Sequence, residues 1–453
     1  MLLSSIIFFD VISYIVEGFM MIWAVFINFD KVKNKQINLI KNYKLLILFL
    51  SGAIITTLIQ IKMLKPINTG FDLIMLLHFF ICFFILYGLH IEKKETLEKE
   101  LISIMQWTVS TTTMLTFLSI LLIIFKIRFV ISGKILMLNP FSYCIGMHFA
   151  EGVERLSGIY INPNIIAFCS VVAIIFSHIL FIKNKFFNKL KKHIQISLFT
   201  ASLILNSAAL ILSDSLAAFI LLSLYIIIML FYSLVLKNKK FSFKSLIKNI
   251  FIFSLIGIIT LISLTIIRGN FQNVASEVIN NIYSTFSTDD VVSEEAENIT
   301  IGRGENHDIR NGSGRRHLLK QALLIFSKNP LMGIGIGNTE EYGKVYFKNG
   351  VDFPNFHNGY VSVAVSYGII GISLFVTFLI CTFIYFIKAL RESLSLKNTI
   401  YPNLVACTSA YCVYSLFEKT MLSEINYMGV FFWFMLGYTT AFASYLLKTH
   451  SKS

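Results

Sequence analysis

Long apolar runs alternate with short polar segments along the whole chain. A membrane-spanning helix needs about 20 consecutive apolar residues, and about eleven runs approach that length. These runs are 2–28, 45–61, 73–91, 101–125, 164–182, 194–213, 215–236, 249–267, 368–387, 403–421 and 426–447. The pattern therefore predicts an all-α polytopic membrane protein. The division between 194–213 and 215–236 is the least marked, because only a short SDS segment interrupts the apolar run there.

The first run is predicted to be a spanning helix rather than a cleaved leader. Residues 2–28 lack the basic start and the small-residue cleavage site of a signal peptide. Their length of about 27 residues also exceeds that of a signal-peptide core.

Composition and charge agree with a membrane protein. Hydrophobic residues make up 56% of the 453 residues and charged residues only 14%. Soluble domains carry about a quarter charged residues. The net charge of +14 comes mainly from lysines in short clusters between apolar runs. This spacing favours the positive-inside rule over nucleic-acid binding.

The lysine clusters also predict the orientation of the chain. Segments 31–44, 183–193, 237–248 and 388–397 and the C-terminal tail fall on one side if every predicted run crosses the membrane, and that side is then cytoplasmic. The N-terminus is accordingly expected outside and the C-terminus inside. Five basic residues oppose this assignment because they fall on the outer side: Lys62, Lys65, Lys126, Arg128 and Lys134.

Two long segments, 126–163 and 268–356, remain on the outer side. The expected organisation is an N-terminal transmembrane bundle of about eight helices (1–267), a large extracytoplasmic loop (268–356) and C-terminal transmembrane helices (357–453). Apolar spacing predicts a short helix at each flank of the loop, over 272–286 and 315–329. The polar, glycine-containing middle predicts a mobile loop.

Cysteines and acidic pairs do not predict a metal centre. The six cysteines lie mostly within apolar runs and form no CxxC pair, so they are predicted to be small hydrophobic residues. The acidic pairs at 289–290 and 294–295 are typical of a solvated loop, and the histidines lack metal-ligand spacing. We therefore expect neither a metal nor a cofactor.

Arg315 and Arg316 begin the helix predicted over 315–329. A guanidinium binds phosphate oxygens through its planar donor fork, and a helix N-terminus adds free N–H groups. The pair is therefore a candidate phosphate clamp. The alternative is a pair of solvated basic residues, or of residues that contact lipid headgroups.

His357 and Asn358 lie where an apolar run resumes after the loop. An imidazole at this outer boundary can act as a general base toward a sugar hydroxyl, and the alternative is a structural hydrogen bond. The nearby GIGIG sequence (333–337) follows Pro330 and a predicted helix rather than a strand, which excludes a dinucleotide or phosphate loop. It predicts a flexible turn whose backbone approaches a ligand.

Several ionisable residues lie within or at the ends of the predicted spans. They are Asp10, Glu17, His78, His178, Asp214, Glu418 and Lys419. Charges within a membrane indicate function, and a proton-coupled transporter would use them. However, Asp214 is predicted at an outer hairpin tip and Glu418 at an outer span end. The cluster that a transporter needs at the membrane midplane is not evident.

The order of these features resembles the O-antigen ligase/polymerase (Wzy-type) superfamily of bacterial membrane glycosyltransferases. The matching elements are SGRRHLLKQAL (313–323), NPLMGIGIGN (329–338), HNGY (357–360), YGIIG (367–371) and RLSGIYINPN (155–164). Two positions depart from the family pattern. Leu216 stands where the family has an arginine at an outer hairpin tip, and Leu319 stands where it has an aromatic residue.

The resemblance implies a GT-C-like membrane fold and a metal-independent, inverting transfer of a glycan from an undecaprenyl-diphosphate carrier to an acceptor hydroxyl. Arg315 would stabilise the leaving diphosphate, and His357 would take the proton from the attacking hydroxyl. The residues implied in binding the diphosphate or the glycan are Arg316, Arg155, Asn358, Tyr360 and Asp214.

Three functions stay open at this point. The first is a polymerase that joins lipid-linked repeat units into capsule, exopolysaccharide or O-antigen. The others are a ligase that moves finished glycan to another acceptor, and a transporter or flippase of lipid-linked sugars. We favour the polymerase because a composition rich in Lys, Asn, Ile and Phe is typical of an AT-rich, often Gram-positive genome. The expected partners are the lipid-linked oligosaccharide, membrane lipid, and a chain-length regulator and a flippase of the same pathway. No nucleic-acid partner is expected.

Overall fold

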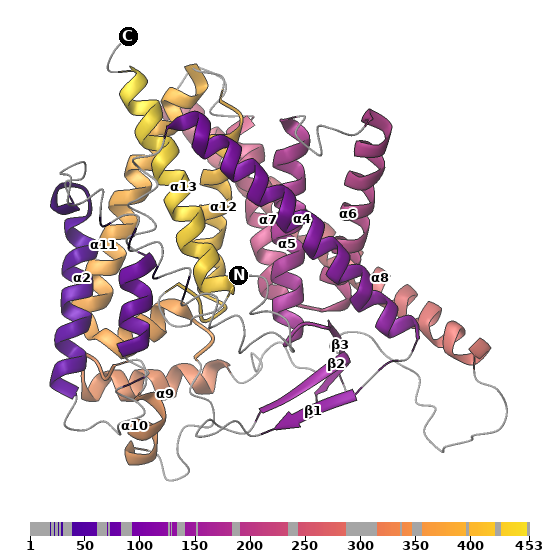
Figure 1. Cartoon of the computed structure of the whole chain (residues 1–453), viewed down its shortest axis with the longest axis horizontal. Helices are drawn as coiled ribbons and strands as arrows, with labels where there is room; N and C mark the ends of the chain where they lie inside the picture. The colour runs from indigo at the N-terminus through magenta and orange to yellow at the C-terminus, as the bar shows by residue number, and fades with distance from the viewer. Residues whose placement is uncertain are drawn as a thin grey trace. The chain divides into compact units, whose positions relative to one another are not determined.

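The chain is largely helical in the computed structural model (Figure 1). The structure describes residues 39–60, 73–82, 93–125, 127, 129–133, 141–150, 153–183, 191–233, 243–286, 315–335, 338–346, 356–395, 398–421 and 427–450, and single residues at 19, 22, 26, 29 and 70. The span predicted over 2–28 therefore falls almost entirely outside the described residues. The same is true of the whole polar middle of the predicted loop.

Eleven helices and three strands have described bounds. The helices are α2 (Leu39–Gln60), α4 (Lys94–Ile124), α5 (Pro163–Ile182), α6 (Lys192–Leu212), α7 (Leu216–Phe231), α8 (Phe243–Phe286), α9 (Arg315–Lys328), α10 (Thr339–Tyr346), α11 (Gly359–Ser395), α12 (Ile400–Tyr414) and α13 (Tyr427–His450). The strands are β1 (Phe129–Gly133), β2 (Phe141–Ala150) and β3 (Val153–Gly158).

Five of the described helices are long and apolar enough to cross a membrane. They cover Lys94–Ile124, Pro163–Ile182, Lys192–Leu212, Gly359–Leu394 and Tyr427–Lys448. Shorter apolar helices occupy Lys44–Gln60, Leu73–Cys82 and Leu216–Phe231, which overlap the predicted spans 45–61, 73–91 and 215–236. These helices confirm a multi-pass membrane protein, whereas the predicted number of spans stays an expectation.

The expectation of an all-α chain is wrong over residues 129–158. Residues 129–133, 141–150 and 153–158 form a three-stranded antiparallel sheet in the order β1-β2-β3, with Phe129 opposite Ile145 and His148 opposite Arg155. The strands of 5, 10 and 6 residues are each too short to cross a membrane as a helix, and aromatic and β-branched residues favour strands. We had read this region only as an outer connection.

The chain divides into two compact units, and the division falls within α4. Unit 1 contains Met1, Ser13–Glu98 and Asp308–Ser453, and unit 2 contains Leu2–Ile12 and Lys99–His307. Each unit is described by itself below.

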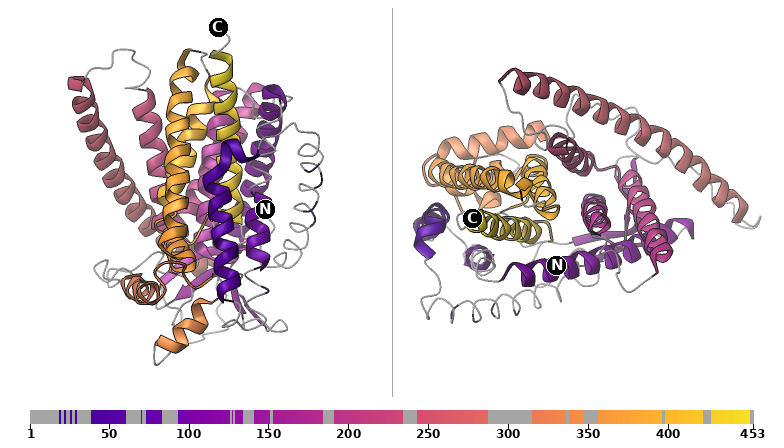
Figure 2. Two further views of the ribbon diagram at one scale, coloured as in Figure 1. Left: turned by 90° about the vertical axis from the view of Figure 1, so that its left-hand side faces the viewer. Right: turned by 90° about the horizontal axis from the view of Figure 1, so that it is seen from above.

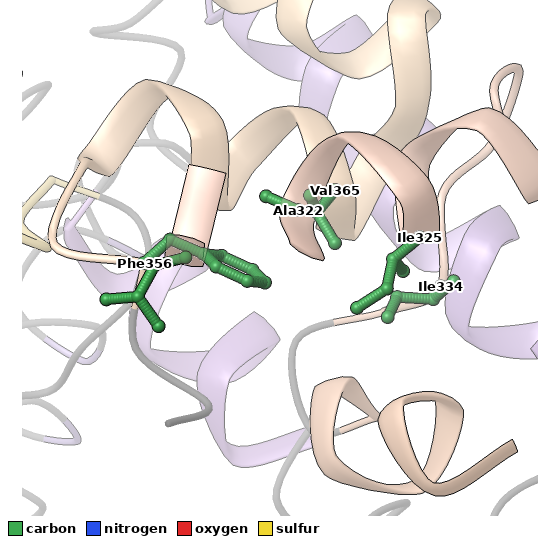
Figure 3. Packing of buried hydrophobic residues seen from close by; sticks show 6 residues of the cluster. Ala322, Ile325, Ile334, Phe356 and Val365 are labelled. Atoms are coloured by element: carbon green, nitrogen blue, oxygen red, sulfur yellow. The ribbon is translucent and has the colours of Figure 1, made fainter. Parts of the chain in front are cut away.

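In unit 1, α11 is the central helix. It packs against α2, α12 and α13 along its length and also contacts α9. Figures 1 and 2 show that α9 runs across α11 instead of beside it: α11 is upright in both side views, and α9 turns from horizontal to end-on. The buried stripe of α9 contains Leu318, Ala322 and Ile325. A small apolar cluster thus forms against Ile334 and Val365 (Figure 3).

In unit 2, α5 is the buried helix. It packs against α6, α7 and β3, and α8 packs against α6 and α7. Asn162 caps α5 by accepting a hydrogen bond from the Ile165 N–H at 3.0 Å, and Pro163 occupies the first turn, where its missing N–H costs nothing. The Asn162 cap and Pro163 thus set the residue at which α5 begins.

Helix α8 joins two elements that were predicted separately. The predicted span 249–267 and the predicted loop helix 272–286 are parts of one 44-residue helix. The expected domain boundary at residue 268 therefore lies within α8.

The segment 330–335 pairs with a break in α11. The N–H groups of Ile334 and Gly335 donate to carbonyls of α11 at 3.1 and 2.8 Å, and the Ile369 N–H donates back to the Pro330 carbonyl at 2.7 Å. At the break, backbone carbonyl and N–H groups of α11 form hydrogen bonds with the turn. Buried backbone groups need such partners because they are out of reach of water.

Two glycines make this pairing possible. Gly368 has φ 67° and ψ −170° within α11, and Gly333 has φ 73°. A Cβ on Gly333 would collide with the backbone of Ser366, and a Cβ on Gly368 would collide with the Leu331 carbonyl. The glycine pattern predicts that the backbone of this turn approaches a ligand. The close approach that the structure shows is to the backbone of α11.

Candidate functional site

His357 lies immediately before α11, in a tightly constrained connection. Its φ is 45°, a left-handed conformation that is uncommon for a side chain of this size. Asn358 caps α11 by accepting a hydrogen bond from the Val361 N–H at 3.0 Å. The Gly359 N–H donates to the Ser415 carbonyl at 2.7 Å. The HNG sequence thus turns the chain, starts the helix and ties it to the end of α12.

Glu418 contacts both residues predicted to be catalytic. Its Oε2 lies 3.3 Å from His357 Nδ1, and its Oε1 lies 3.4 Å from an Arg315 guanidinium nitrogen. The Glu418 side chain is 8% exposed, whereas those of Arg315 and His357 are 35% and 29% exposed. One buried carboxylate therefore bridges two partly exposed groups that solvent or a ligand can reach.

The segment that carries Glu418 is fixed by buried polar contacts. The Thr420 hydroxyl donates to the Ser415 hydroxyl at 2.5 Å, and the Phe417 N–H donates to the Tyr414 carbonyl at 2.8 Å. The indole of Trp433 donates to the Met421 carbonyl at 3.3 Å. The predicted span 403–421 in fact ends as a helix at Tyr414, so Glu418 stands on a short ordered turn.

Arg315 is positioned by the packing of α9. It is the first residue of that helix, and Leu318 follows it into the buried stripe that includes Ala322 and Ile325. Figure 3 shows Ala322 beside Val365 of α11 and Ile325 beside Ile334 of the glycine turn. The same cluster contains Phe356, which precedes His357. The apolar contacts that hold α9 are thus the ones that hold the histidine segment.

The contact with Glu418 indicates which nitrogen of the His357 imidazole carries the proton. An ionised carboxylate only accepts hydrogen bonds, so His357 Nδ1 is the donor to Glu418. In a neutral ring, Nε2 then carries the lone pair. This is the arrangement that a general base needs, with the second nitrogen held by an orienting group.

A second charged cluster lies in unit 2, at the connection between α6 and α7. Asp214 is fully buried with φ 49°, and it forms an ion pair with Arg268 of α8. Gln272, one turn further along α8, donates to Asp214 Oδ1 at 2.9 Å. The Arg268 guanidinium also lies 5.8 Å from the centre of the Phe219 ring. Arg268 thus reaches the hairpin tip at which Leu216 replaces the arginine expected from the family pattern.

Arg155 reaches the same connection from β3. Its Nε donates to the Ser213 carbonyl at 2.8 Å, and a terminal nitrogen donates to Asn164 Oδ1 at 2.8 Å. Within unit 2, two arginines therefore meet the Ser213–Ser215 tip. Arg303 and Arg310, which lie in sequence between α8 and α9, are outside the described residues.

The remaining predicted residues have different surroundings. Tyr360 donates its hydroxyl hydrogen to the Cys412 carbonyl at 3.0 Å and so joins α11 to α12. Arg316 is exposed on α9. Among the residues described, no group of three or more His, Cys, Asp or Glu side chains has an arrangement that could hold a metal ion.

Glu418 is the site residue that sequence reasoning missed. We had treated it only as a charge at the end of a predicted span, together with Lys419. The available signal was its predicted position at the same membrane face as the HNGY motif. Its separation of 61 residues from His357 concealed the contact.

Comparison with known proteins supports the resemblance drawn from the motifs. No curated protein matches the chain. Residues 201–376 match the model of the O-antigen ligase family, a range that contains Asp214, Arg268, Arg315 and His357. Arg155 and Glu418 lie outside this range. The predicted resemblance to the O-antigen ligase/polymerase superfamily is thus confirmed over residues 201–376.

Proposed function

We propose that the protein is a membrane glycosyltransferase that polymerises undecaprenyl-diphosphate-linked repeat units into a capsular polysaccharide, exopolysaccharide or O-antigen. The family match supports an O-antigen ligase/polymerase type of membrane function. The observation that carries the proposal further is the bridge in unit 1, where Glu418 contacts both Arg315 and His357. It brings together a cation for a leaving phosphate and an oriented base for a hydroxyl.

The proposed reaction is a direct displacement at the anomeric carbon. The acceptor hydroxyl oxygen forms a bond to that carbon, and the bond from the carbon to the carrier diphosphate breaks. His357 Nε2 takes the hydroxyl proton, and the electron pair leaves with the diphosphate. Attack opposite the leaving group inverts the anomeric configuration. No other proton acceptor is required for this step.

Arg315 stabilises the charge that develops on the leaving diphosphate. A guanidinium remains charged and offers paired donors to phosphate oxygens. Its contact with Glu418 at 3.4 Å is long for an ion pair, and its side chain is 35% exposed. In our proposal the diphosphate contacts the exposed part of this guanidinium while Glu418 continues to hold the other side.

The arginines of the unit 2 cluster are proposed to bind phosphate or glycan groups of a lipid-linked substrate. Arg155 and Arg268 supply positive charge at the hairpin tip, and Asp214 contributes by holding Arg268. Asn358, Tyr360 and Arg316 remain proposed contacts to the glycan or the diphosphate. For Asn358 and Tyr360 the observed hydrogen bonds show in addition a role in fixing α11.

The proposed orientation places the bridge at the outer face of the bacterial cytoplasmic membrane, with the N-terminus outside and the C-terminus inside. A phosphatase or fluorescent reporter inserted within 288–310 tests this directly. We expect alkaline phosphatase to be active there and a cytoplasmic fluorescent protein to be dark. The opposite pattern would contradict the orientation.

A ligase remains the second candidate, because the matching family model is described as O-antigen ligase. The two activities share the donor and differ in the acceptor. A polymerase produces a ladder of lengths from lipid-linked repeat units alone. A ligase leaves that donor unextended until a separate acceptor is added.

The decisive experiment is incubation of the purified protein in nanodiscs with undecaprenyl-diphosphate-linked repeat units, with products separated by length. We expect a ladder of polymers from the wild type, none from His357→Ala, and a ladder in the presence of a chelator. His317→Ala is the matched control, because His317 is also a histidine of unit 1 and its ring contacts Gln321 on α9. Equal ladders from His357→Ala and the wild type would contradict the assignment, and loss of the ladder in chelator, restored by a divalent cation, would contradict metal independence.

A further inference from the structure

Helix α9 exposes more apolar surface than its packing against unit 1 covers. Leu318, Ala322 and Ile325 form its buried stripe. Going round the helix from this stripe, the partly buried Phe326 comes next, and then Leu319 and Leu323. Leu319 is 45% exposed and Leu323 is 57% exposed, although both would be favoured inside an apolar environment. The apolar face of α9 is thus about twice as wide as the stripe that contacts the protein.

Basic residues follow the exposed leucines. Arg316 and Lys320 are one turn apart, are both exposed, and lie next to Leu319 and Leu323 round the helix. Lys328 ends the helix, and its sequence RRHLLKQALLIFSK contains no acidic residue. Leu331, which follows in the glycine turn, is 63% exposed. Within α9, an apolar strip bordered by the basic residues Arg316 and Lys320 is complementary to the boundary between acyl chains and anionic headgroups.

The direction of α9 fits such a surface. Figures 1 and 2 show α9 running across α11, which is a membrane-spanning candidate. The contact is made near Val365, in the first turns of α11. If α11 crosses the membrane, α9, which runs across it near one end, lies closer to the membrane plane than to the membrane normal. Leu319 and Leu323 can then reach the acyl chains while Arg316 and Lys320 remain among the headgroups.

We propose that α9 is an interfacial helix that rests on the lipid surface through Leu319 and Leu323, with Arg316 and Lys320 binding anionic headgroups. The occupant of this face is the bilayer itself. A consequence is that lipid fixes the depth of the helix whose first residue is Arg315. This inference does not depend on the reaction proposed above.

The test uses tryptophan fluorescence of the full-length protein in nanodiscs whose acyl chains carry bromine near the headgroup end. Leu323→Trp and Leu319→Trp are each compared with Leu324→Trp, and the wild-type signal is subtracted. Leu324 is a matched control because it is also an exposed leucine, at 41%, and lies about 100° further round the helix than Leu323. We expect bromine to quench the added fluorescence at 319 and 323 about twofold or more compared with 324.

A second arm tests the headgroup contact. Quenching of Leu323→Trp is measured in nanodiscs of zwitterionic lipid and in nanodiscs that also contain anionic phosphatidylglycerol. We expect stronger quenching with the anionic lipid, and loss of that difference in the variant that also carries Arg316→Gln and Lys320→Gln. Equal quenching at 323 and 324, or none at 319 and 323, would overturn the proposal. Protection from bromine that appears only when the protein self-associates would assign this face to a second copy of the chain instead.

Discussion

The two charged clusters of this protein each hold an arginine against a buried carboxylate, yet they hold it differently. In unit 1, Glu418 divides its two oxygens between Arg315 and His357 at 3.4 and 3.3 Å. In unit 2, Asp214 pairs with Arg268 and also accepts from Gln272 through the same oxygen. Arg268 is 21% exposed, compared with 35% for Arg315. The first carboxylate is shared and its partners are accessible, whereas the second is fully buried and tightly paired.

This difference suggests a division of labour. The long contacts to Glu418 orient the Arg315 and His357 side chains. Because both side chains stay partly exposed, they can also bind a ligand. A compact buried pair mainly satisfies the charges that folding has removed from water. We therefore expect changes in unit 1 to lower activity before stability, and changes at Asp214 to lower stability at least as much as activity.

The largest effect is expected for His357→Ala. Removal of a general base typically slows a reaction by about 10²–10⁴-fold. We expect a loss of polymerisation rate in that range, measured as repeat units transferred per enzyme per minute in nanodiscs. The thermal midpoint should stay close to that of His317→Ala. An unchanged rate would remove the base from the proposal, and a collapsed melting curve would indicate a structural role.

Arg315 and Arg316 provide the next test, because they are neighbours with different surroundings. Removing one donor to a developing oxyanion costs about 10²–10³-fold in rate. We expect a loss of that size for Arg315→Ala and less than about tenfold for Arg316→Ala, since only Arg315 contacts Glu418. Rates measured with the same lipid-linked donor decide the comparison. Equal losses would mean that both guanidiniums bind the diphosphate.

Glu418→Gln should have a smaller effect than either catalytic change. The amide retains the shape of the side chain but no longer forces His357 Nδ1 to be the donor. We expect kcat to fall about 10- to 100-fold with little change in KM, because a mispositioned base slows chemistry more than it weakens binding. Glu418→Asp tests the geometry alone. A change confined to KM would assign Glu418 to substrate binding.

Sequence reasoning identified the apolar spans and the two ends of the bridge more readily than it identified the bridge itself. The helices α5, α11 and α13 coincide with long apolar runs, because a span must be continuous in sequence. Arg315 and His357 stood out through motifs. Glu418 did not, because its role depends on the turn after α12 lying close to Arg315 and His357 in the folded chain.

The sheet and the pairing of Arg268 with Asp214 were missed for a similar reason. Strands β1 to β3 are defined by pairing between segments, and their short sequences resemble an outer connection. Arg268 appeared to follow a span, and only the continuation of α8 to Phe286 brings it to Asp214. A contact between distant segments depends on helix packing, which a hydrophobic pattern does not encode.

The smallest effect, and the one that best separates the two clusters, is expected from Asp214→Asn. The neutral side chain leaves Arg268 without its buried counter-charge, and breaking a buried pair costs up to about 3–5 kcal/mol. Because Arg268 is partly exposed and can reach water, we expect a loss of about 1–2 kcal/mol in unfolding free energy. Thermal or denaturant unfolding in detergent measures it, with Glu418→Gln as the comparison. Restoration of stability by adding Arg268→Met would show that the loss came from the stranded arginine. If instead Glu418→Gln were the less stable variant and Asp214→Asn the less active one, the proposed division of labour between the clusters would be reversed.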